Sequence, residues 1–312
     1  MTRALIAIGT NSTRLLVLDG LRRLAAESRG TRIGQGLGAD GTLAPDARER
    51  TLAAVGDYVA IARERGARSI DVVATSALRR TGDAAAFGAE VAQLTGIGPR
   101  VISGAEEASF SFLGATAARS GEREVAVLDV GGGSSDLAID TPGHAREVGI
   151  VRRTISCEIG AVRLSERHPA LLGAGPLDEC ERTALEMEAR RDARLVLAAY
   201  AKHRGFDELI VVGGTAFTAA AMVANGMRDG TAMTRDDCAH LISALLARGL
   251  EERKRLPHIR PQRADILPAG LIVIDEACKL LDVDRFTVSE ADLLLGYLTS
   301  PAFRSVVLPP AP

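Results

Sequence analysis

Residues 125–140 read VAVLDVGGGSSDLAID, and this stretch has the pattern of two apolar strands joined by a glycine-rich turn. The first strand carries Asp129 near its end, where a carboxylate leaves the sheet edge and can meet Mg²⁺. Glycines have no Cβ, so their backbone N–H groups can approach phosphate oxygens closely. The turn therefore supplies a set of candidate phosphate ligands, namely Gly131, Gly132, Gly133, Ser134 and Ser135.

A glycine-rich hairpin turn without any ligand is the alternative interpretation of this stretch. A second copy of the pattern at the start of the chain argues against it. Residues 4–7 form an apolar strand, a small polar turn follows, and residues 14–18 form another strand. Two such units predict two facing lobes, with a phosphate held between two hairpins and the reaction placed in the cleft. The first turn adds the candidate ligands Gly9, Thr10, Asn11 and Ser12.

The paired hairpins resemble the architecture of the actin and sugar-kinase group. This resemblance implies an α/β protein with two actin-like lobes (the ASKHA, ribonuclease H-like fold) and an active-site cleft between them. Helix-like stretches also alternate with apolar strands along the chain. We expect helices near 46–65, 81–96, 105–118, 177–203, 235–250 and 263–281, and strands near 69–74, 99–103, 124–130, 135–140 and 208–212. The lobes are expected to comprise residues 1–118 and 119–312, with the boundary near 116–122.

Five short motifs give a more specific resemblance. In chain order they are GTNS (9–12), ATSALR (74–79), VISGAEEA (101–108), DVGGGS (129–134) and GAVRL (160–164). With these motifs in this order, the chain resembles the exopolyphosphatase/guanosine pentaphosphate phosphatase (Ppx/GppA) family, in a short two-domain form. The resemblance implies hydrolysis of a terminal phosphoanhydride.

The paired acids Glu106 and Glu107 follow an Ile-Ser-Gly sequence at the expected start of a helix. Glu107 matches the catalytic glutamate of the family, which implies a role as general base or water-positioning group. Attack of water on a phosphoryl group needs such a residue, together with in-line positioning and compensation of the oxygen charges. The alternative is that both acids only favour the dipole of the first helical turn.

Arginines are the other candidate phosphate ligands, because a planar guanidinium can bind two phosphate oxygens at once. Arg79 follows an apolar strand and a Thr-Ser pair, so we expect it at the carboxyl end of that strand, facing the cleft. The family match makes Arg79 a phosphate ligand, whereas a surface ion pair is the alternative. Arg32 and Arg163 are weaker candidates, for which a structural salt bridge is an equal alternative.

A later strand, residues 210–212, ends in Gly-Gly-Thr before an alanine-rich helix. Helix N-termini with glycine bind anions, so Gly214 and Thr215 are predicted phosphate ligands; a glycine-capped helix start is the alternative. The sequence Arg263-Ala264-Asp265, expected to open an apolar helix, and the pair Ser289-Glu290 also match family positions. For Asp265, a plain first-turn acid is the alternative.

Three departures from the family pattern affect the expected metal site, which consists of Asp129 and Asp136 and would bind Mg²⁺ or another divalent cation. The family normally has an acid at the position of Ala7, so one carboxylate near the metal is missing. Asp136 is one methylene shorter than the usual glutamate, and Leu294 stands where an arginine is common. Mg²⁺ can be held by one carboxylate plus substrate phosphates, so we expect weaker metal binding and weaker grip on polyphosphate.

Composition excludes several other classes of protein. A net charge of −2 and only 3% aromatic residues, without a basic tail, argue against nucleic acid as a partner. No apolar run reaches membrane-spanning length and no secretory leader is visible, so no membrane association is expected. Four cysteines without a Cys-x-x-Cys spacing give no support for zinc and agree with a reducing cytoplasm.

The function predicted from the sequence is release of terminal orthophosphate from inorganic polyphosphate. Longer family members carry further C-terminal domains that extend a basic channel, and the chain stops where those would begin, so short polyphosphates are the expected substrate. Guanosine pentaphosphate (pppGpp) is the alternative substrate. A non-catalytic phosphate or nucleotide sensor of the same fold is an alternative that Ala7 favours, and a sugar kinase is a third. The oligomeric state stays open, and a homodimer is compatible with the sequence.

Overall fold

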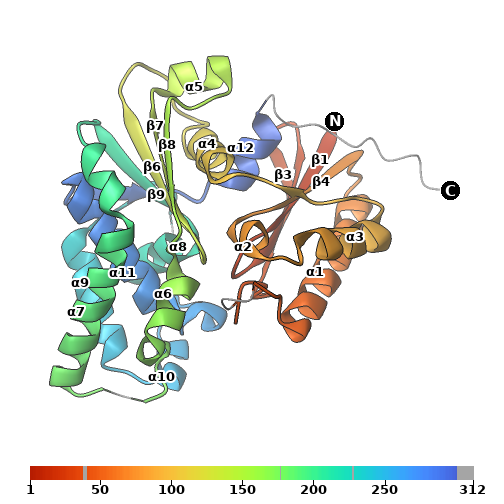
Figure 1. The fold of residues 1–312 in the computed structure, drawn as a ribbon. Helices are drawn as coiled ribbons and strands as arrows, with labels where there is room; N and C mark the ends of the chain where they lie inside the picture. The colour runs from red at the N-terminus through yellow and green to blue at the C-terminus, as the bar shows by residue number, and fades with distance from the viewer. Residues whose placement is uncertain (38–40, 176, 227, 301–312) are drawn as a thin grey trace.

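The computed structural model of the protein describes residues 1–37, 41–175, 177–226 and 228–300, and it contains two mixed β-sheets with helices packed on both (Figure 1). The first sheet has the strand order β3-β2-β1-β4-β5 and the second the order β10-β11-β9-β6-β7-β8. The first consists of β1 (Thr2–Ile8), β2 (Thr13–Asp19), β3 (Arg22–Arg29), β4 (Ser69–Ala74) and β5 (Arg100–Val101). The second consists of β6 (Val125–Val130), β7 (Ser135–Asp140), β8 (Arg153–Cys157), β9 (Glu208–Val212), β10 (Thr231–Thr234) and β11 (Arg285–Val288).

The two sheets share one local plan. β1 pairs antiparallel with β2 on one side and parallel with β4 on the other, and β6 pairs in the same way with β7 and β9. The central strands β1, β4 and β6 are almost entirely buried, as their continuous apolar sequences require. The prediction of a two-lobed, actin-like α/β fold built on paired hairpins is confirmed.

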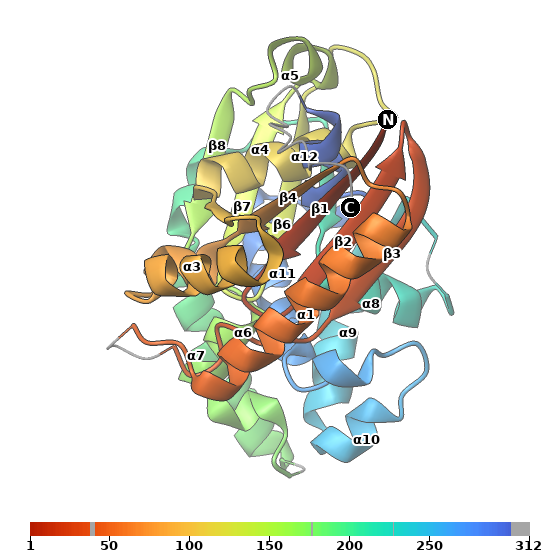
Figure 2. The ribbon, with the colours of Figure 1, turned by 90° about the vertical axis from the view of Figure 1, so that its right-hand side faces the viewer.

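Helices cover the outer faces of both sheets. The structure has α1 (Pro45–Glu64), α2 (Ser76–Arg80), α3 (Ala84–Thr95), α4 (Gly104–Ala115), α5 (Pro142–Val148), α6 (Ala161–Arg167), α7 (Glu179–Val196), α8 (Gly214–Val223), α9 (Arg235–Leu246), α10 (Leu250–Lys254), α11 (Leu267–Leu281) and α12 (Leu293–Thr299). Short 3₁₀ turns lie at Pro169–Leu172, Ala198–Lys202 and Pro261–Arg263. Figure 2 shows α1 crossing the outer face of the first sheet, where Val55 and Tyr58 join the core of the first lobe.

Helices α4 and α12 lie between the two sheets and pack against each other, although they are far apart in the sequence. Phe110 of α4 packs with Tyr297 of α12 against the inner face of the first sheet, and their rings meet edge to face at 4.9 Å. On its other side, α4 packs against β6 and β9 through Phe112. A side chain on Gly114 or Gly296 would overlap the backbone of the opposing helix, so only glycine permits this approach.

The predicted boundary near 118–119 stays a prediction. The structure adds that α12, from the segment assigned to the second lobe, contacts β1 and α4.

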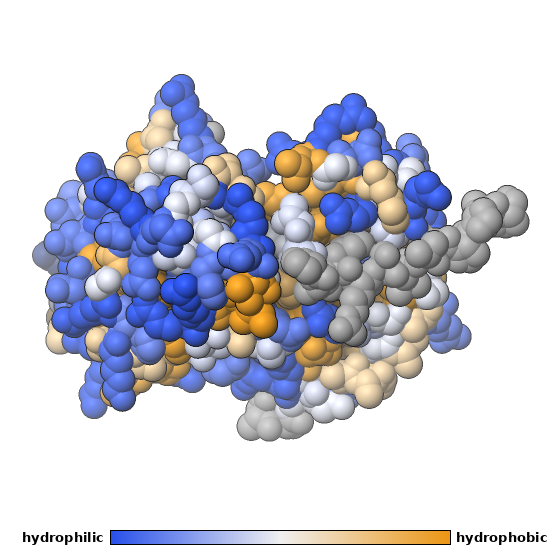
Figure 3. Space-filling view, turned by 90° about the horizontal axis from the view of Figure 1, so that it is seen from above, coloured by the Kyte–Doolittle hydropathy of each residue, from blue (hydrophilic) through white to orange (hydrophobic). Residues whose placement is uncertain are grey.

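Seen from above, hydrophobic side chains gather in the middle of a largely hydrophilic surface, between two raised parts of the molecule (Figure 3). None of the described helices is both long and apolar enough to cross a membrane.

Several predicted elements differ in their bounds. The helix expected at 263–281 begins at Leu267, after a 3₁₀ turn, so Asp265 precedes the helix and the first-turn interpretation of this acid is wrong. The stretch 177–203 forms α7 and then a 3₁₀ turn, and 235–250 ends as a helix at Leu246. A 3₁₀ turn at Pro169–Leu172 lies ahead of α7.

Candidate active site

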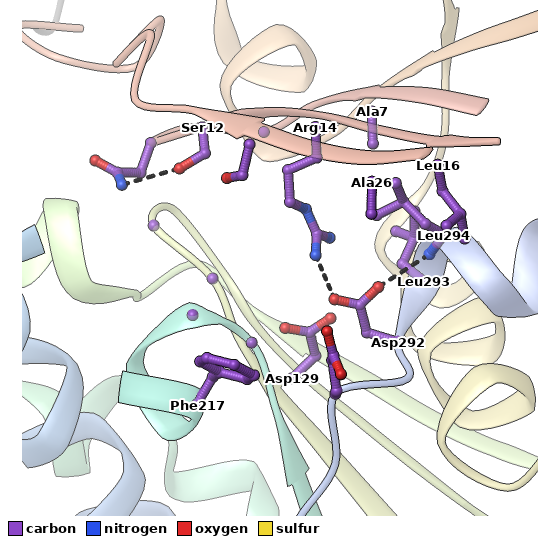
Figure 4. Close-up of a pocket in the computed structure, with 18 of the residues that line it drawn as sticks. Ala7, Ser12, Arg14, Leu16, Ala26, Asp129, Phe217, Asp292, Leu293 and Leu294 are labelled. Carbon is purple, nitrogen blue, oxygen red and sulfur yellow. Dashed lines mark hydrogen bonds and ion pairs between the residues drawn. The ribbon is translucent and has the colours of Figure 1, made fainter. Parts of the chain in front are cut away.

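A cleft of about 900 Å³ lies between the lobes, and both glycine-rich turns line it (Figure 4). Each turn is closed by the same kind of backbone hydrogen bond. The N–H of Gly9 donates to the carbonyl of Ser12, and the N–H of Gly131 to the carbonyl of Ser134, each at 3.0 Å. The two turns lie against each other: a Cβ added to Gly133 of the second turn would lie only 2.6 Å from Oγ1 of Thr10 in the first. A Cβ at position 133 would therefore displace the side chains of Thr10 and Ser76, whereas glycine fits without such a shift.

Most of the predicted ligands line this cleft. They are Gly9, Thr10, Asn11, Ser12, Gly131, Gly132, Gly133, Ser134 and Gly214, together with Glu107 and Asp129. Four predicted site residues do not line the cleft: Arg79, Ser135, Asp136 and Thr215. For Ser135 and Thr215 the reason is that neighbouring residues in a strand or a helix point in different directions. Ser135 is fully buried and donates to the carbonyl of Ile159 at 2.6 Å, and Thr215 packs against Gly270 of α11.

The start of α4 separates the roles of the two glutamates. Ser103 caps the helix in a capping box with Glu106, whose carboxylate also pairs with Arg100 at 2.8 Å. Glu106 therefore stabilises the helix start. Glu107 points into the cleft, is 9% exposed, and accepts a hydrogen bond from Arg79 at 2.7 Å. Burial raises the pKa of Glu107 to about 7, although Arg79 opposes the shift. A carboxyl group of this pKa is suited to accept a proton near neutral pH.

Arg79 is the partner of Glu107 and lies in α2, one turn beyond the end of β4, where the sequence had placed it at the strand end itself. Its Nη1 also donates to the carbonyl of Ile102 at 3.0 Å. The side chain is only 16% exposed, so the surface ion pair considered from the sequence is wrong. Its Nη2 is buried and has no hydrogen-bond partner among the residues that the structure describes. Arg79 is not among the residues that line the cleft, so its direct contact with phosphate stays a prediction.

Asp129 and Asp136 lie directly opposite each other on β6 and β7. Asp129 reaches the cleft and accepts a hydrogen bond from Ser111 at 2.6 Å, whereas Asp136 lies behind it, 2% exposed, and accepts from Ser134 at 2.9 Å. Burial raises the pKa of Asp129, and it raises the pKa of Asp136 well above its usual range with a further contribution from Glu107. A nearby cation or a bound proton would therefore stabilise both of these buried carboxyl groups.

The donors of this pair are of the kind that Mg²⁺ prefers, and Oδ1 of Asp136 is buried without a hydrogen-bond partner in the described part of the chain. Across residues 1–37, 41–175, 177–226 and 228–300, no group of three or more His, Cys, Asp or Glu side chains is arranged to hold a metal ion. A Mg²⁺ ion at this pair would thus take most of its ligands from water and phosphate. The roles of Asp129 and Asp136 stay predictions.

The cleft also contains charged residues to which the sequence analysis gave no role or only a passing one. Arg14 of β2 forms an ion pair with Asp292, which caps α12 (Figure 4). Arg263 donates to Oγ of Ser12 at 3.1 Å, and burial lowers its pKa to about 10. A charged residue inside an apolar strand was the available signal for Arg14, and an Asp before a run of leucines was the signal for Asp292.

Two weaker candidates are held by ion pairs. Arg32 of the first lobe pairs with Asp265 at 2.7 Å and also donates to the carbonyl of Gln262 at 3.0 Å. Arg163 pairs with Glu158 at 2.6 Å. Both observations favour the structural salt bridges that the sequence left as an alternative. Ala7 and Leu294, the positions that depart from the family pattern, both line the cleft.

Several known proteins are similar to this chain over nearly its whole length. The model of the Ppx/GppA phosphatase family matches residues 14–302. Exopolyphosphatase 2 of Mycobacterium tuberculosis is 33% identical over 326 residues, covering 95% of this chain and 97% of that protein. The crystal structure of an exopolyphosphatase-like protein has a TM-score of 0.82 at 28% identity, covering 95% and 97% of the two chains. A PPX-GPPA enzyme of Aquifex aeolicus has a TM-score of 0.75 at 25% identity, covering 96% and 99%.

Proposed function

This chain belongs to the Ppx/GppA phosphatase family, and we propose that it is an exopolyphosphatase that releases orthophosphate from the end of inorganic polyphosphate. The observation that carries the proposal is the position of Glu107. Its carboxylate lies in the cleft beside the two glycine-rich turns, buried and paired with Arg79. The identity to an exopolyphosphatase over nearly the whole chain supports the choice of substrate.

In the proposed reaction, the turns hold the terminal phosphate through backbone N–H groups and the hydroxyls of Thr10, Ser12 and Ser134. A water oxygen bonds to the terminal phosphorus while the bridging P–O bond breaks, and the shortened polyphosphate keeps the electron pair of that bond. Glu107 accepts the proton of the water, a contribution worth about 10²–10⁴-fold in rate. Arg79 orients Glu107 through the hydrogen bond that its Nη1 donates to the carboxylate.

Asp129, with Asp136 behind it, would hold Mg²⁺ or another divalent cation in this site. When bound, the ion would neutralise charge on the nonbridging oxygens of the phosphates. The cytoplasmic location and the oligomeric state, including a homodimer, stay predictions from the sequence.

Guanosine pentaphosphate is the second candidate substrate, on the basis of one feature of the cleft. Phe217 lines it beyond Gly214, and the guanidinium of Arg260 lies 4.7 Å from the centre of the Phe217 ring. An aromatic ring beside a guanidinium is a surface on which a base can stack. One assay separates the candidates: release of orthophosphate from polyphosphates of several lengths and from pppGpp, with and without Mg²⁺. Faster release from pppGpp than from every polyphosphate would reverse the order of the two.

The pH dependence of the reaction follows from the raised pKa of Glu107. Because the base must be ionised, we expect kcat/KM to fall by about tenfold per pH unit below pH 7 and to level off above it. The residual activity of a Glu107→Gln variant is the control, since it lacks this carboxylate. If wild type and variant showed the same acid limb, the titrating group would be one other than Glu107.

The missing carboxylate at position 7 gives a prediction about the metal. Ala7→Asp should lower the Mg²⁺ concentration for half-maximal hydrolysis, because Ala7 lines the cleft and an added acid there strengthens attraction for a dication. Asp129→Ala should raise that concentration and reduce the rate far more. The measurement is a Mg²⁺ titration of phosphate release for wild type and both variants. An unchanged metal dependence in Ala7→Asp would mean that the site is built around another ligand and that position 7 does not contribute to it.

A further inference from the structure

The two hairpins that bear the phosphate turns are equivalent in register but opposite in charge. In the second lobe, Asp129 lies opposite Asp136, two residues before and two residues after the closed turn 131–134. In the first lobe, the same positions flank the turn 9–12 and carry Ala7 and Arg14, which also lie opposite each other. A guanidinium therefore occupies, in one hairpin, the place of a carboxylate in the other.

Arg14 reaches from the first sheet toward the carboxylates of the opposite wall. Figure 4 shows its side chain pointing at Asp292, with Asp129 close by, and the ion pair with Asp292 joins β2 to the start of α12. Both Asp129 and Glu107 also attract the Arg14 guanidinium. The side chain of Arg14 is 31% exposed and that of Asp292 10%, so solvent screens the pair only in part.

A count of charges shows why this position matters. Four carboxylates interact electrostatically in this region: Asp129 with Glu107 and Asp292, and Asp136 with Glu107 and Asp129. The guanidinium groups of Arg14 and Arg79 supply the opposing charge. Arg79 is committed to Glu107 and the carbonyl of Ile102. The neighbouring Arg263 faces Ser12, and Asp265 is paired with Arg32. Arg14 is thus the cation that faces both Asp129 and Asp292 in the described cleft.

We propose that Arg14 is the built-in counter-cation of this carboxylate cluster and competes with Mg²⁺ for Asp129, so that Arg14 sets the affinity of the site for divalent cations. The effect of Arg14 on catalysis rests on the proposed function. Because a fixed guanidinium already neutralises part of the carboxylate charge, hydrolysis should depend less on a bound metal ion. The competition itself does not require that the protein hydrolyse anything, and it can be measured without substrate.

The test is binding of Mg²⁺ alone, by isothermal titration calorimetry, to the folded full-length protein. Replacing Arg14 by Gln removes one positive charge that Asp129 attracts, so we expect Mg²⁺ to bind about tenfold more tightly or better. Arg14→Lys keeps the charge and should stay within about threefold of wild type. Unchanged or weaker binding in Arg14→Gln would overturn the proposal, as would tightening of the same size in Arg14→Lys.

Arg23→Gln is the matched control, because Arg23 also pairs with an acid of the other half of the chain, Glu290 at 3.2 Å, but at a position more than half exposed. Its Mg²⁺ affinity should equal that of wild type; tightening equal to that of Arg14→Gln would show a general effect of net charge and overturn the proposal. Should Arg14→Gln fail to fold, Arg14→Met tests the same competition, since it removes the positive charge and keeps an unbranched side chain. Tighter Mg²⁺ binding then supports the proposal, and unchanged or weaker binding contradicts it.

Discussion

Glu107→Gln should reduce the rate of phosphate release from polyphosphate by about 10²–10⁴-fold, because the amide keeps the shape of the side chain but cannot accept the proton of the attacking water. Folding and substrate binding should change little. The amide oxygen of the variant can still accept the hydrogen bond that Arg79 donates to the carboxylate at 2.7 Å. The measurement is kcat on a short polyphosphate under saturating Mg²⁺, with the melting temperature as a check on folding.

The neighbouring residue provides the matched control for this substitution. Glu106 is in the capping box of α4 and pairs with Arg100, so Glu106→Gln should cost some helix stability but leave the chemistry intact. A loss of less than about tenfold in Glu107→Gln would contradict the role of Glu107 as the base. Equal loss in both variants would assign the pair to the helix start alone.

Arg79→Lys should impair the enzyme almost as much as Arg79→Ala. The guanidinium uses Nη1 for Glu107 and Ile102 and leaves Nη2 without a partner among the described residues, and an ammonium cannot reproduce this geometry. A hydrogen bond to a charged group contributes about 1.5–3 kcal/mol, which corresponds to a loss of about ten- to a hundredfold. The measurement is kcat/KM on a short polyphosphate for both variants.

The pH profile of the Arg79 variants gives an independent readout. Since Arg79 opposes the upward shift of the Glu107 pKa, its removal should raise that pKa further and move the acid limb of kcat/KM to higher pH in Arg79→Ala. Wild-type affinity and a wild-type pH profile in Arg79→Lys would mean that the charge alone suffices and that no two-oxygen contact is made.

The parts of the fold that the sequence predicted are those in which local pattern and tertiary structure agree. The strands of the two hairpins are continuous apolar runs that must be buried, and glycine-rich turns join them in the order found. The strand β3 was missed because its sequence, RRLAAESR, has no apolar alternation and forms an exposed edge. The start of α11 was misplaced because a 3₁₀ turn can carry residues that resemble a helix start.

The candidate site shows the same division. The turn residues, such as Gly9 and Gly131, line the cleft, and their binding of phosphate stays a prediction. Ser135 and Thr215 were included because they belong to the motifs, but their side chains face the interior. The ion pair of Arg14 with Asp292 could not be predicted from the sequence, because its members are 278 positions apart and only the tertiary packing of α12 against α4, β1 and β2 brings them together.

The most direct test of the proposed function is the product pattern on a polyphosphate of defined length. The purified protein, with Mg²⁺ present, should release orthophosphate one unit at a time from the chain end, leaving polymers that shorten progressively, and Glu107→Gln at equal concentration should release almost none. Cleavage inside the chain, or no orthophosphate from any polyphosphate at any Mg²⁺ concentration, would contradict the assignment of this cleft to exopolyphosphatase chemistry.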